Sequence, residues 1–148
     1  MDESQLNAMI RKDPVMNRVT WGVFARNELP TITTLLPGAY VVNSRTRRTG
    51  GQHWFLIYVE EEEGRPVEFY DSLGKDPKDY DLNIECIYNE RRVQAENTET
   101  CGLYVLYFLY WRSRGVNMHD ILLTLNQKNN TVNERIVLEH CSLLLMLP

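Results

Sequence analysis

Residues 93–111 read VQAENTETCGLYVLYFLYW, a polar segment that meets an uninterrupted apolar run at a cysteine. From Cys101 to Trp111 every residue is apolar, aromatic or glycine. A helix of this composition is hydrophobic on all sides and has to lie inside a domain. Residues suited to helix ends flank the run: Asn97, Thr98 and Glu99 before it, and Arg112, Arg114 and Gly115 after it. The sequence therefore predicts a buried central helix with Cys101 in its first turn.

Cys101 is predicted to lie where a helix favours negative charge. In the first turn the backbone N–H groups are unpaired and the helix dipole is positive, so a thiol there is biased toward the thiolate, the form that attacks. A small buried hydrophobic residue is the more common role of a cysteine. Cys101 alone therefore leaves a nucleophile and a core residue as alternatives.

Two further stretches supply groups that a nucleophilic cysteine needs. Residues 50–59, GGQHWFLIYV, predict a glycine turn that enters a strand, with His53 at its start. Residues 67–74, VEFYDSLG, predict a second short strand that ends at Asp71 before a turn. In chain order the sequence then offers a base, an acid, an amide donor and a thiol: His53, Asp71, Gln94 and Cys101. These are the groups that thiol-dependent acyl transfer requires.

With these residues the sequence resembles the adenovirus-type cysteine proteases, called adenain, and their relatives from large virus-like DNA transposons and small DNA viruses. This family shares a clan with the proteases that deconjugate SUMO and similar modifiers. The matching segments are residues 41–43, 49–54, 69–74, 93–94 and 97–103, with a weaker match at 22–24 and 29–30. The sequence departs from adenain in two respects. The acid is Asp71, as in the SUMO-protease branch, whereas adenain carries glutamate. The sequence also ends soon after the central helix.

The resemblance implies a papain-type α+β fold and a mechanism. His53 would take the proton of Cys101, Asp71 would fix the tautomer of the imidazole, and the thiolate would attack a carbonyl carbon. Gln94, together with the backbone N–H of Cys101, would hold the developing oxyanion. Cleavage after small residues, particularly at Gly-X-Gly or Gly-Gly ends, is also implied. The residues expected to contact the substrate are Gly51, Trp54, Asn97 and Gly102. For Trp54, packing in the core is the alternative role.

The function we expect is that of a cysteine endopeptidase that cleaves capsid precursor proteins of a virus or transposon during maturation. An isopeptidase that deconjugates a ubiquitin-like modifier uses the same chemistry and is the alternative. A non-catalytic binding module with the same fold is a third hypothesis. The complete set of triad residues argues against the module, and the small size and the match at 49–54 favour the endopeptidase.

The resemblance also implies activating partners, because adenain is assisted by a short capsid-derived peptide and by viral DNA. Arg45, Arg47 and Arg48 are the candidates for a DNA contact, with a solvated surface as their alternative role. Cys86 could form a disulfide with such a peptide or be its docking point. We expect a monomer that works in the host nucleus or cytoplasm and in the virion.

Length and composition fit a single domain that spans residues 1–148. The chain is 43% hydrophobic and 24% charged with a net charge of -4, which argues against a general nucleic-acid binder. Three cysteines without a CxxC pair suggest free thiols in a reducing compartment, and the acidic start of the chain is unlike a secretion signal. The run at 103–111 is too short to span a bilayer.

Several other cysteines, histidines and acids are weaker candidates for the site: Cys86, Cys141, His119, His140, Asp79 and Asp81. Cys86 lies in an extended stretch and Cys141 on an apolar helix, and neither begins a helix. The histidines and cysteines show no pair at zinc-ligand spacing, so we expect no metal. Asp79 and Asp81 lie in a charged loop and are expected to be solvated.

The remaining elements follow from periodicity and breakers. The other predicted helices are 4–11, 118–125 and 133–145. In the last of these, residues 136–138 and 143–146 are expected to face the core. The predicted strands are 39–43, 53–60 and 67–71, which form a meander, followed by extended pieces at 84–88 and 91–94. Residues 31–37 predict a loop, 75–81 a surface connection with one helical turn, and the mixed segment 21–29 no element. Strands in the middle with helices grouped at both ends predict the α+β class, with a small mixed or antiparallel sheet flanked by helices.

Overall fold

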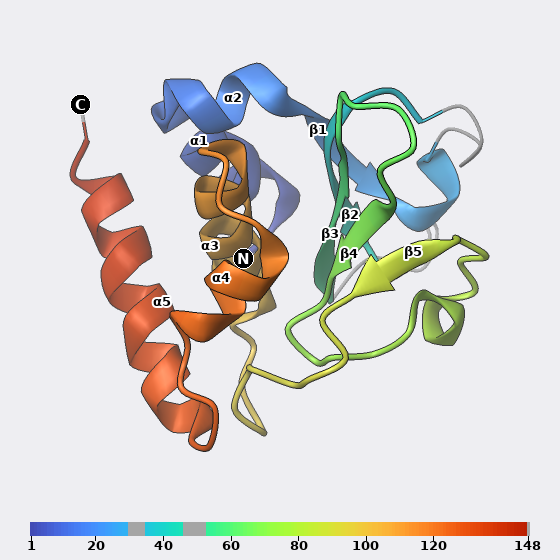
Figure 1. Ribbon diagram of the computed structural model, residues 1–148. Coiled ribbons are helices and arrows are strands. Elements are labelled where there is room, and N and C mark those ends of the chain that lie inside the picture. Colours follow the sequence, from blue (N-terminus) through green and yellow to red (C-terminus); the bar gives the residue numbers. More distant parts are fainter. Residues whose placement is uncertain (30–34, 46–52, 148) are drawn as a thin grey trace.

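The computed structural model describes residues 1–29, 35–45 and 53–147 and confirms the α+β class (Figure 1). The helices are α1 (Glu3–Lys12), α2 (Pro14–Val19), α3 (Cys101–Ser113), α4 (Met118–Leu123) and α5 (Asn130–Leu145). The strands are β1 (Thr20–Ala25), β2 (Gly38–Asn43), β3 (Trp54–Val59), β4 (Val67–Tyr70) and β5 (Cys86–Tyr88). Short 3-10 helices, η1 (Arg26–Glu28) and η3 (Pro77–Tyr80), lie in the connections.

The strands form one mixed sheet in the order β1-β2-β3-β4-β5. The predicted meander is confirmed, because β2 pairs with β3 and β3 with β4, both antiparallel. The outer pairs, β1 with β2 and β4 with β5, are parallel. Leu56 of β3 is opposite Tyr70 of β4, so the start of β3 and the end of β4 lie at the same end of the sheet.

The predicted central helix is confirmed as α3. It lies between α5 and the sheet, in contact with both (Figure 1). The large side chains along it, such as Tyr104, Leu106 and Phe108, are fully buried. On the sheet, Leu56 and Tyr70 belong to the same core cluster. A helix that is apolar on all sides can be stable only when both of its flanks are covered in this way.

The opposite face of the sheet carries a second core, which the connection between β4 and β5 covers. Phe55, Ile57 and Phe69 point to this face, as expected from the alternation of side chains along a strand. Tyr80 and Leu82 of the connection pack against them. The expectation of a purely surface connection at 75–81 is therefore wrong, although its helical turn exists as η3.

The N-terminal third contains two elements that the sequence did not predict, α2 and β1. The sequence predicted that α1 ends before Pro14, but Pro14 also begins α2. A proline is compatible with the first turn of a helix. Asp13 caps that turn by accepting a hydrogen bond from the Val15 N–H (3.3 Å). β1 is an edge strand with a register shift between Thr20 and Gly22. Its irregular burial explains why it has no alternating apolar pattern.

Two helix starts differ from the prediction. α3 begins at Cys101 itself, with Thr100 as the cap residue, so the expected caps Asn97 and Thr98 and the first-turn residue Glu99 all precede it. Asn97 instead has a left-handed backbone with a φ of 59°. α5 begins at Asn130, three residues earlier than predicted, because the Asn129 side chain caps it.

The expectation that residues 143–146 face the core is wrong for most of them. Leu143 and Met146 are 67% and 80% exposed, and only Leu144 of this cluster is buried. Of the residues expected to face the core earlier in the helix, Val137 is buried, whereas Leu138 is exposed. Successive residues of a helix point in different directions, so a helix that packs on one side buries only part of a continuous apolar run. Residues 91–94 form an irregular segment and not a strand. Among the described residues, no helix has both the length and the apolar character needed to cross a membrane.

Candidate active site

The start of β3, the end of β4 and the start of α3 frame a cleft of 440 Å³. His53, Gln94 and Cys101 line this cleft. Asp71 lies behind His53 and is fully buried. The structure thus brings together the four residues that the sequence singled out, each from the end of an element or from the segment just before one.

The imidazole of His53 is held by a buried carboxylate. His53 Nε2 lies 2.7 Å from Asp71 Oδ1. Three further donors satisfy Asp71: the backbone N–H groups of Leu73 (3.0 Å) and Lys75 (3.2 Å) and the hydroxyl of Tyr80 (2.6 Å). Burial of a carboxylate is costly unless donors replace its water, so this set keeps Asp71 in one orientation and fixes the ring of His53.

The turn after β4 places Asp71 through its own backbone. Asn89 accepts from the Asp71 N–H (2.8 Å) and donates to the Asp71 carbonyl (2.6 Å). Gly74 closes the turn by donating its N–H to Asp71 O (2.8 Å) with a φ of +71°. A Cβ at Gly74 would lie 2.6 Å from backbone atoms of Arg91 and Arg92, so only glycine allows the two segments to approach.

The thiol of Cys101 lies between the imidazole and the start of β3. The Trp54 backbone N–H lies 3.4 Å from Cys101 Sγ, and the ring of His53 is also hydrogen-bonded to the thiol. Because Nε2 is held by Asp71, Nδ1 is the ring nitrogen left for Cys101.

The pKa values of His53 and Cys101 are both shifted in the direction that favours an imidazolium and a thiolate. Burial alone would lower the pKa of His53, but its hydrogen bonds to Asp71 and Cys101 outweigh burial and raise the pKa to about 9. Burial alone would raise the pKa of Cys101, but the hydrogen bonds from His53 and the Trp54 N–H outweigh it and lower the pKa. The geometry therefore favours a thiolate beside an imidazolium, the arrangement of an activated cysteine nucleophile.

The other two cysteines are in the opposite situation. Burial and the nearby Asp76 raise the pKa of Cys86 to about 11, and burial raises the pKa of Cys141 to about 12. None of the three cysteines, all of which lie in the described part of the chain, forms a disulfide. Only Cys101 therefore combines a lowered pKa with a position in the cleft.

Gln94 is buried and its amide is held at both ends. Its Nε2 donates to the carbonyl and to the hydroxyl of Thr98, both at 3.0 Å. Its Oε1 accepts from the hydroxyl of Ser72 at 2.6 Å. Gln94 and Thr98 line the same cleft as Cys101, and the amide nitrogen of Gln94 lies against Thr98.

Of the four residues expected to contact a substrate, the structure places Trp54 in the cleft. Its indole N–H donates to the carbonyl of Met1 (2.9 Å), which also lines the cleft. Gly102 is buried under Met1 rather than exposed to the cleft, and a Cβ there would lie 3.1 Å from Met1 Cβ. Asn97 is exposed and is not among the lining residues. Gly51 lies outside the described residues.

Sequence reasoning missed several residues of the site: Ser72, Tyr80, Asn89 and Met1. Tyr80 donates to Asp71 and also stacks on His53, with ring centroids 5.6 Å apart and an interplanar angle of 22°. The alternation of Tyr80, Leu82 and Ile84 with polar residues is a period-two signal that could have indicated a buried face here. Ser72 and Asn89 act through hydrogen bonds to segments that are distant in sequence, and they carry no such signal.

The weaker candidates lie elsewhere. His140 is surrounded by the rings of Tyr107, Tyr110 and Trp111 on the far side of α3. His119 is exposed, and Asp81 pairs with Arg26 at the surface (3.4 Å). Within the described ranges, no group of three or more His, Cys, Asp or Glu side chains is placed to hold a metal ion.

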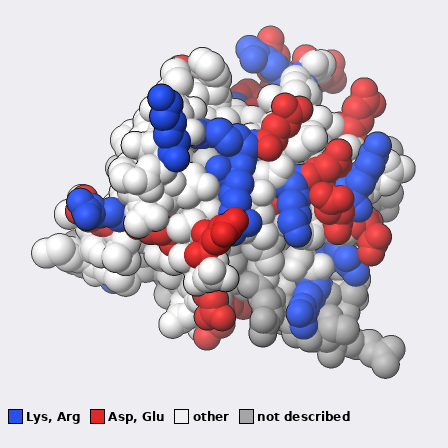
Figure 2. All heavy atoms as spheres, turned by 90° about the horizontal axis from the view of Figure 1, so that it is seen from below, with Lys and Arg blue, Asp and Glu red and all other residues white. Residues whose placement is uncertain are grey.

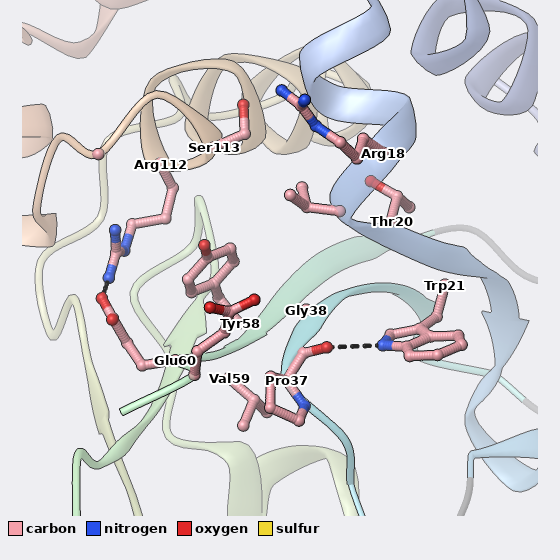
Figure 3. Close-up of a pocket in the computed structure, with 13 residues that line it drawn as sticks. Arg18, Thr20, Trp21, Pro37, Gly38, Tyr58, Val59, Glu60, Arg112 and Ser113 are labelled. Atoms are coloured by element: carbon pink, nitrogen blue, oxygen red, sulfur yellow. Dashed lines mark hydrogen bonds and ion pairs between the residues drawn. The ribbon is translucent and has the colours of Figure 1, made fainter. Parts of the chain in front are cut away.

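A larger cavity of 720 Å³ lies at the other ends of β3 and α3 (Figure 3). Trp21, held by a hydrogen bond to the Pro37 carbonyl (2.9 Å), and Tyr58 form part of its wall, and Arg112 pairs with Glu60 beside them. None of the described residues that line it is a cysteine or a histidine. The smaller cleft is therefore the better candidate for chemistry.

The face of the molecule shown in Figure 2 bears on a possible nucleic-acid site. On the face that Figure 2 shows, basic and acidic side chains are intermingled, and, the grey residues aside, neither sign covers it alone. Of the arginines considered for a DNA contact, Arg45 is described and exposed, whereas Arg47 and Arg48 lie outside the described residues. A DNA contact stays a prediction.

The comparisons with known proteins bear on the fold. No family model and no curated protein matches the sequence. Among solved structures, the chain is similar to the central domain of the uncharacterized Lpg1148 protein from Legionella pneumophila, with a TM-score of 0.50. The two are 15% identical, and the match covers 89% of this chain and 97% of that one. At this identity the likeness shows a shared α+β fold and nothing about chemistry.

Proposed function

We propose that this protein is a cysteine peptidase with His53 as the base, Asp71 as the orienting acid and Cys101 as the nucleophile. The observation that carries the proposal is one imidazole held between a fully buried carboxylate and a thiol whose pKa is lowered. A structural cysteine needs neither partner. A peptidase needs both, because the same ring has to stabilise the thiolate and then protonate the leaving amine.

The reaction follows from this arrangement. The Cys101 thiolate forms a C–S bond to the carbonyl carbon while the carbonyl π electrons move to oxygen. The C–N bond breaks as the leaving nitrogen takes the proton from His53. Water then attacks the thioester, His53 accepts the proton of that water, and the C–S bond breaks to restore the thiolate and the imidazolium. Asp71 holds the ring throughout and stabilises its charge whenever the ring is protonated.

The developing oxyanion needs donors near the start of α3. We assign this role to the side-chain amide of Gln94, together with the backbone N–H of Cys101. Support comes from the position of Gln94, which lines the same cleft as Cys101 and whose amide nitrogen is held by Thr98, another residue of the cleft wall.

The resemblance to adenain extends the proposal to the substrate: capsid precursor proteins cleaved at glycine-containing sites, with a capsid-derived peptide or DNA as activators. The packing of Trp54 against Met1 restricts the cleft on one side, which fits small substrate side chains. A deconjugating isopeptidase shares every catalytic step and differs only in the amine that leaves.

A two-substrate assay tests the proposal. The protein is incubated with a candidate capsid precursor and with a modifier conjugate, with and without DNA and peptide. We expect cleavage of the precursor, its loss in Cys101→Ala with the fold retained, and its persistence in the matched variant Cys86→Ser. Cleavage of the conjugate alone would identify the isopeptidase. Equal cleavage by Cys101→Ala would reject a thiol mechanism at this site.

A further inference from the structure

Ser72 connects the acid and the proposed oxyanion donor. It follows Asp71 directly, is 2% exposed, and donates its hydroxyl to Gln94 Oε1 at 2.6 Å. Its backbone carbonyl accepts from the N–H groups of both Val93 (2.9 Å) and Gln94 (3.0 Å). One buried serine thus holds the backbone and the side chain of Gln94.

The contacts of Gln94 determine which way its amide points. A carbonyl can only accept a hydrogen bond, so the end of the amide that faces the Thr98 carbonyl has to be the NH₂ group. The oxygen end then faces Ser72, and the Ser72 hydroxyl has to act as the donor. Without this hydroxyl, Oε1 would lose its buried partner.

We propose that Ser72 is a positioning residue that holds the amide of Gln94 in one orientation, with its NH₂ group at Thr98 on the wall of the cleft. The inference rests on the proposed function for its catalytic meaning. Ser72 also ties the two halves of the site together, because the turn that fixes the Asp71 carboxylate also fixes the Gln94 amide. A preorganised donor needs no reorganisation when charge develops on the substrate oxygen, so a loosened amide reduces turnover rather than substrate affinity.

Turnover of the precursor gives the first test. We expect Ser72→Ala to lower kcat by roughly three- to tenfold, the range of one neutral hydrogen bond, with KM unchanged. Gln94→Ala should lower kcat by about 10²–10³, as for loss of an oxyanion donor. Ser72→Thr, which keeps the hydroxyl, should restore part of the activity. Ser113→Ala is the matched control, since it removes a hydroxyl that donates to the Tyr110 carbonyl (2.9 Å) far from the cleft.

A double-mutant cycle separates positioning from general damage. If Ser72 acts through Gln94, adding Ser72→Ala to Gln94→Ala should leave kcat as it is in Gln94→Ala alone. If the reductions in kcat caused by Ser72→Ala and by Gln94→Ala multiply in the double variant, Ser72 supports only the fold, and the inference is overturned.

Nuclear magnetic resonance provides a readout that does not need turnover. The side-chain NH₂ of Gln94 should be ordered in the wild type and Ser113→Ala, and more mobile and faster exchanging in Ser72→Ala. An amide that stays ordered in Ser72→Ala overturns the inference whatever the activity. A wild type that cleaves neither substrate, with an amide that loosens in Ser72→Ala, rejects the peptidase and upholds the positioning role of Ser72.

Discussion

At the residue scale, His53 has a different partner for each ring nitrogen. Asp71 holds Nε2, and the hydrogen bonds to Asp71 and Cys101 outweigh burial and raise the pKa of the ring to about 9. The proposed chemistry therefore depends on a proton that stays on the ring at neutral pH while the thiol gives its own proton up.

The pH dependence of thiol reactivity follows from these shifts. Cys101 should be alkylated first and at neutral pH, because its pKa is lowered, whereas the pKa values of Cys86 (about 11) and Cys141 (about 12) keep those thiols protonated. Peptidase activity should fall on the acid side as the Cys101 thiolate is protonated, and on the alkaline side near pH 9 as His53 loses its proton.

Mass spectrometry of iodoacetamide-treated protein at a series of pH values provides the measurement. His53→Ala should shift the midpoint of Cys101 alkylation to higher pH, because burial then acts on the thiol without the compensating hydrogen bond. A midpoint that His53→Ala leaves in place would mean that the two residues are not coupled.

At the element scale, the turn after β4 and the irregular segment before α3 have to approach within van der Waals distance. Gly74 is the point of contact and has a φ of +71°. A Cβ on this residue would collide with backbone atoms of Arg91 and Arg92. The segment at 91–94 carries Gln94, so its placement follows from this contact.

Gly74→Ala should therefore lower the free energy of unfolding by about 1–3 kcal/mol, from backbone strain plus the displaced segment. Gly64→Ala is a matched control. Gly64 also has a positive φ, +83°, but no described atom lies within 4 Å of the place that an added methyl group would take, so only the conformational cost of about 1 kcal/mol applies. Chemical denaturation measures the free energy of unfolding of both variants. If Gly74→Ala and Gly64→Ala lost equal amounts, the close approach of Gly74 to residues 91 and 92 would not explain the cost.

The same scale shows what the sequence could predict. α3 was predictable because a run from Cys101 to Trp111 without a charged side chain leaves a helix no exposed face, and the β2–β3–β4 meander was predictable from its apolar strands and turns. β1 was not, because an edge strand with a register shift has no alternating pattern. The exposed side of α5 was missed because an apolar run does not show which residues meet a neighbour.

For the site, position at element ends was the useful signal. His53, Asp71 and Cys101 each lie at or beside the end of an element, where a side chain can reach a cleft, and the structure brings them together. Ser72 and Asn89 could not be recognised, because their roles depend on hydrogen bonds between segments that are distant in sequence.

At the scale of the whole molecule, buried ion pairs anchor the end of α3 that lies away from Cys101. Arg112 donates from Nε and Nη2 to both carboxylate oxygens of Glu68 on β4 (2.9 and 3.1 Å) and also pairs with Glu60. The side chains of Arg112 and Glu68 are 7% and 8% exposed. The helix is thus tied to the sheet by charge at one end and by the proposed site at the other.

Arg112→Met should lower the free energy of unfolding by about 3–5 kcal/mol, because it leaves the Glu68 carboxylate buried without its cation. The double variant Arg112→Met/Glu68→Gln should recover part of that loss. Arg65→Ala, at a surface pair with Glu62, should cost under about 1 kcal/mol. Urea titration followed by circular dichroism gives all three values, and a loss in Arg112→Met no larger than in Arg65→Ala would contradict the account.

The hydrogen bond from the Trp54 N–H to the Cys101 sulfur joins residues 47 positions apart in the chain. During synthesis the base and the acid are made first, on the β3–β4 hairpin, and the nucleophile follows on the helix that fills the core. A nascent chain therefore carries no activated thiol until β3 and α3 have met. By this order of assembly, the proposed peptidase would stay harmless to its own unfolded chain and to the translation machinery until folding was complete.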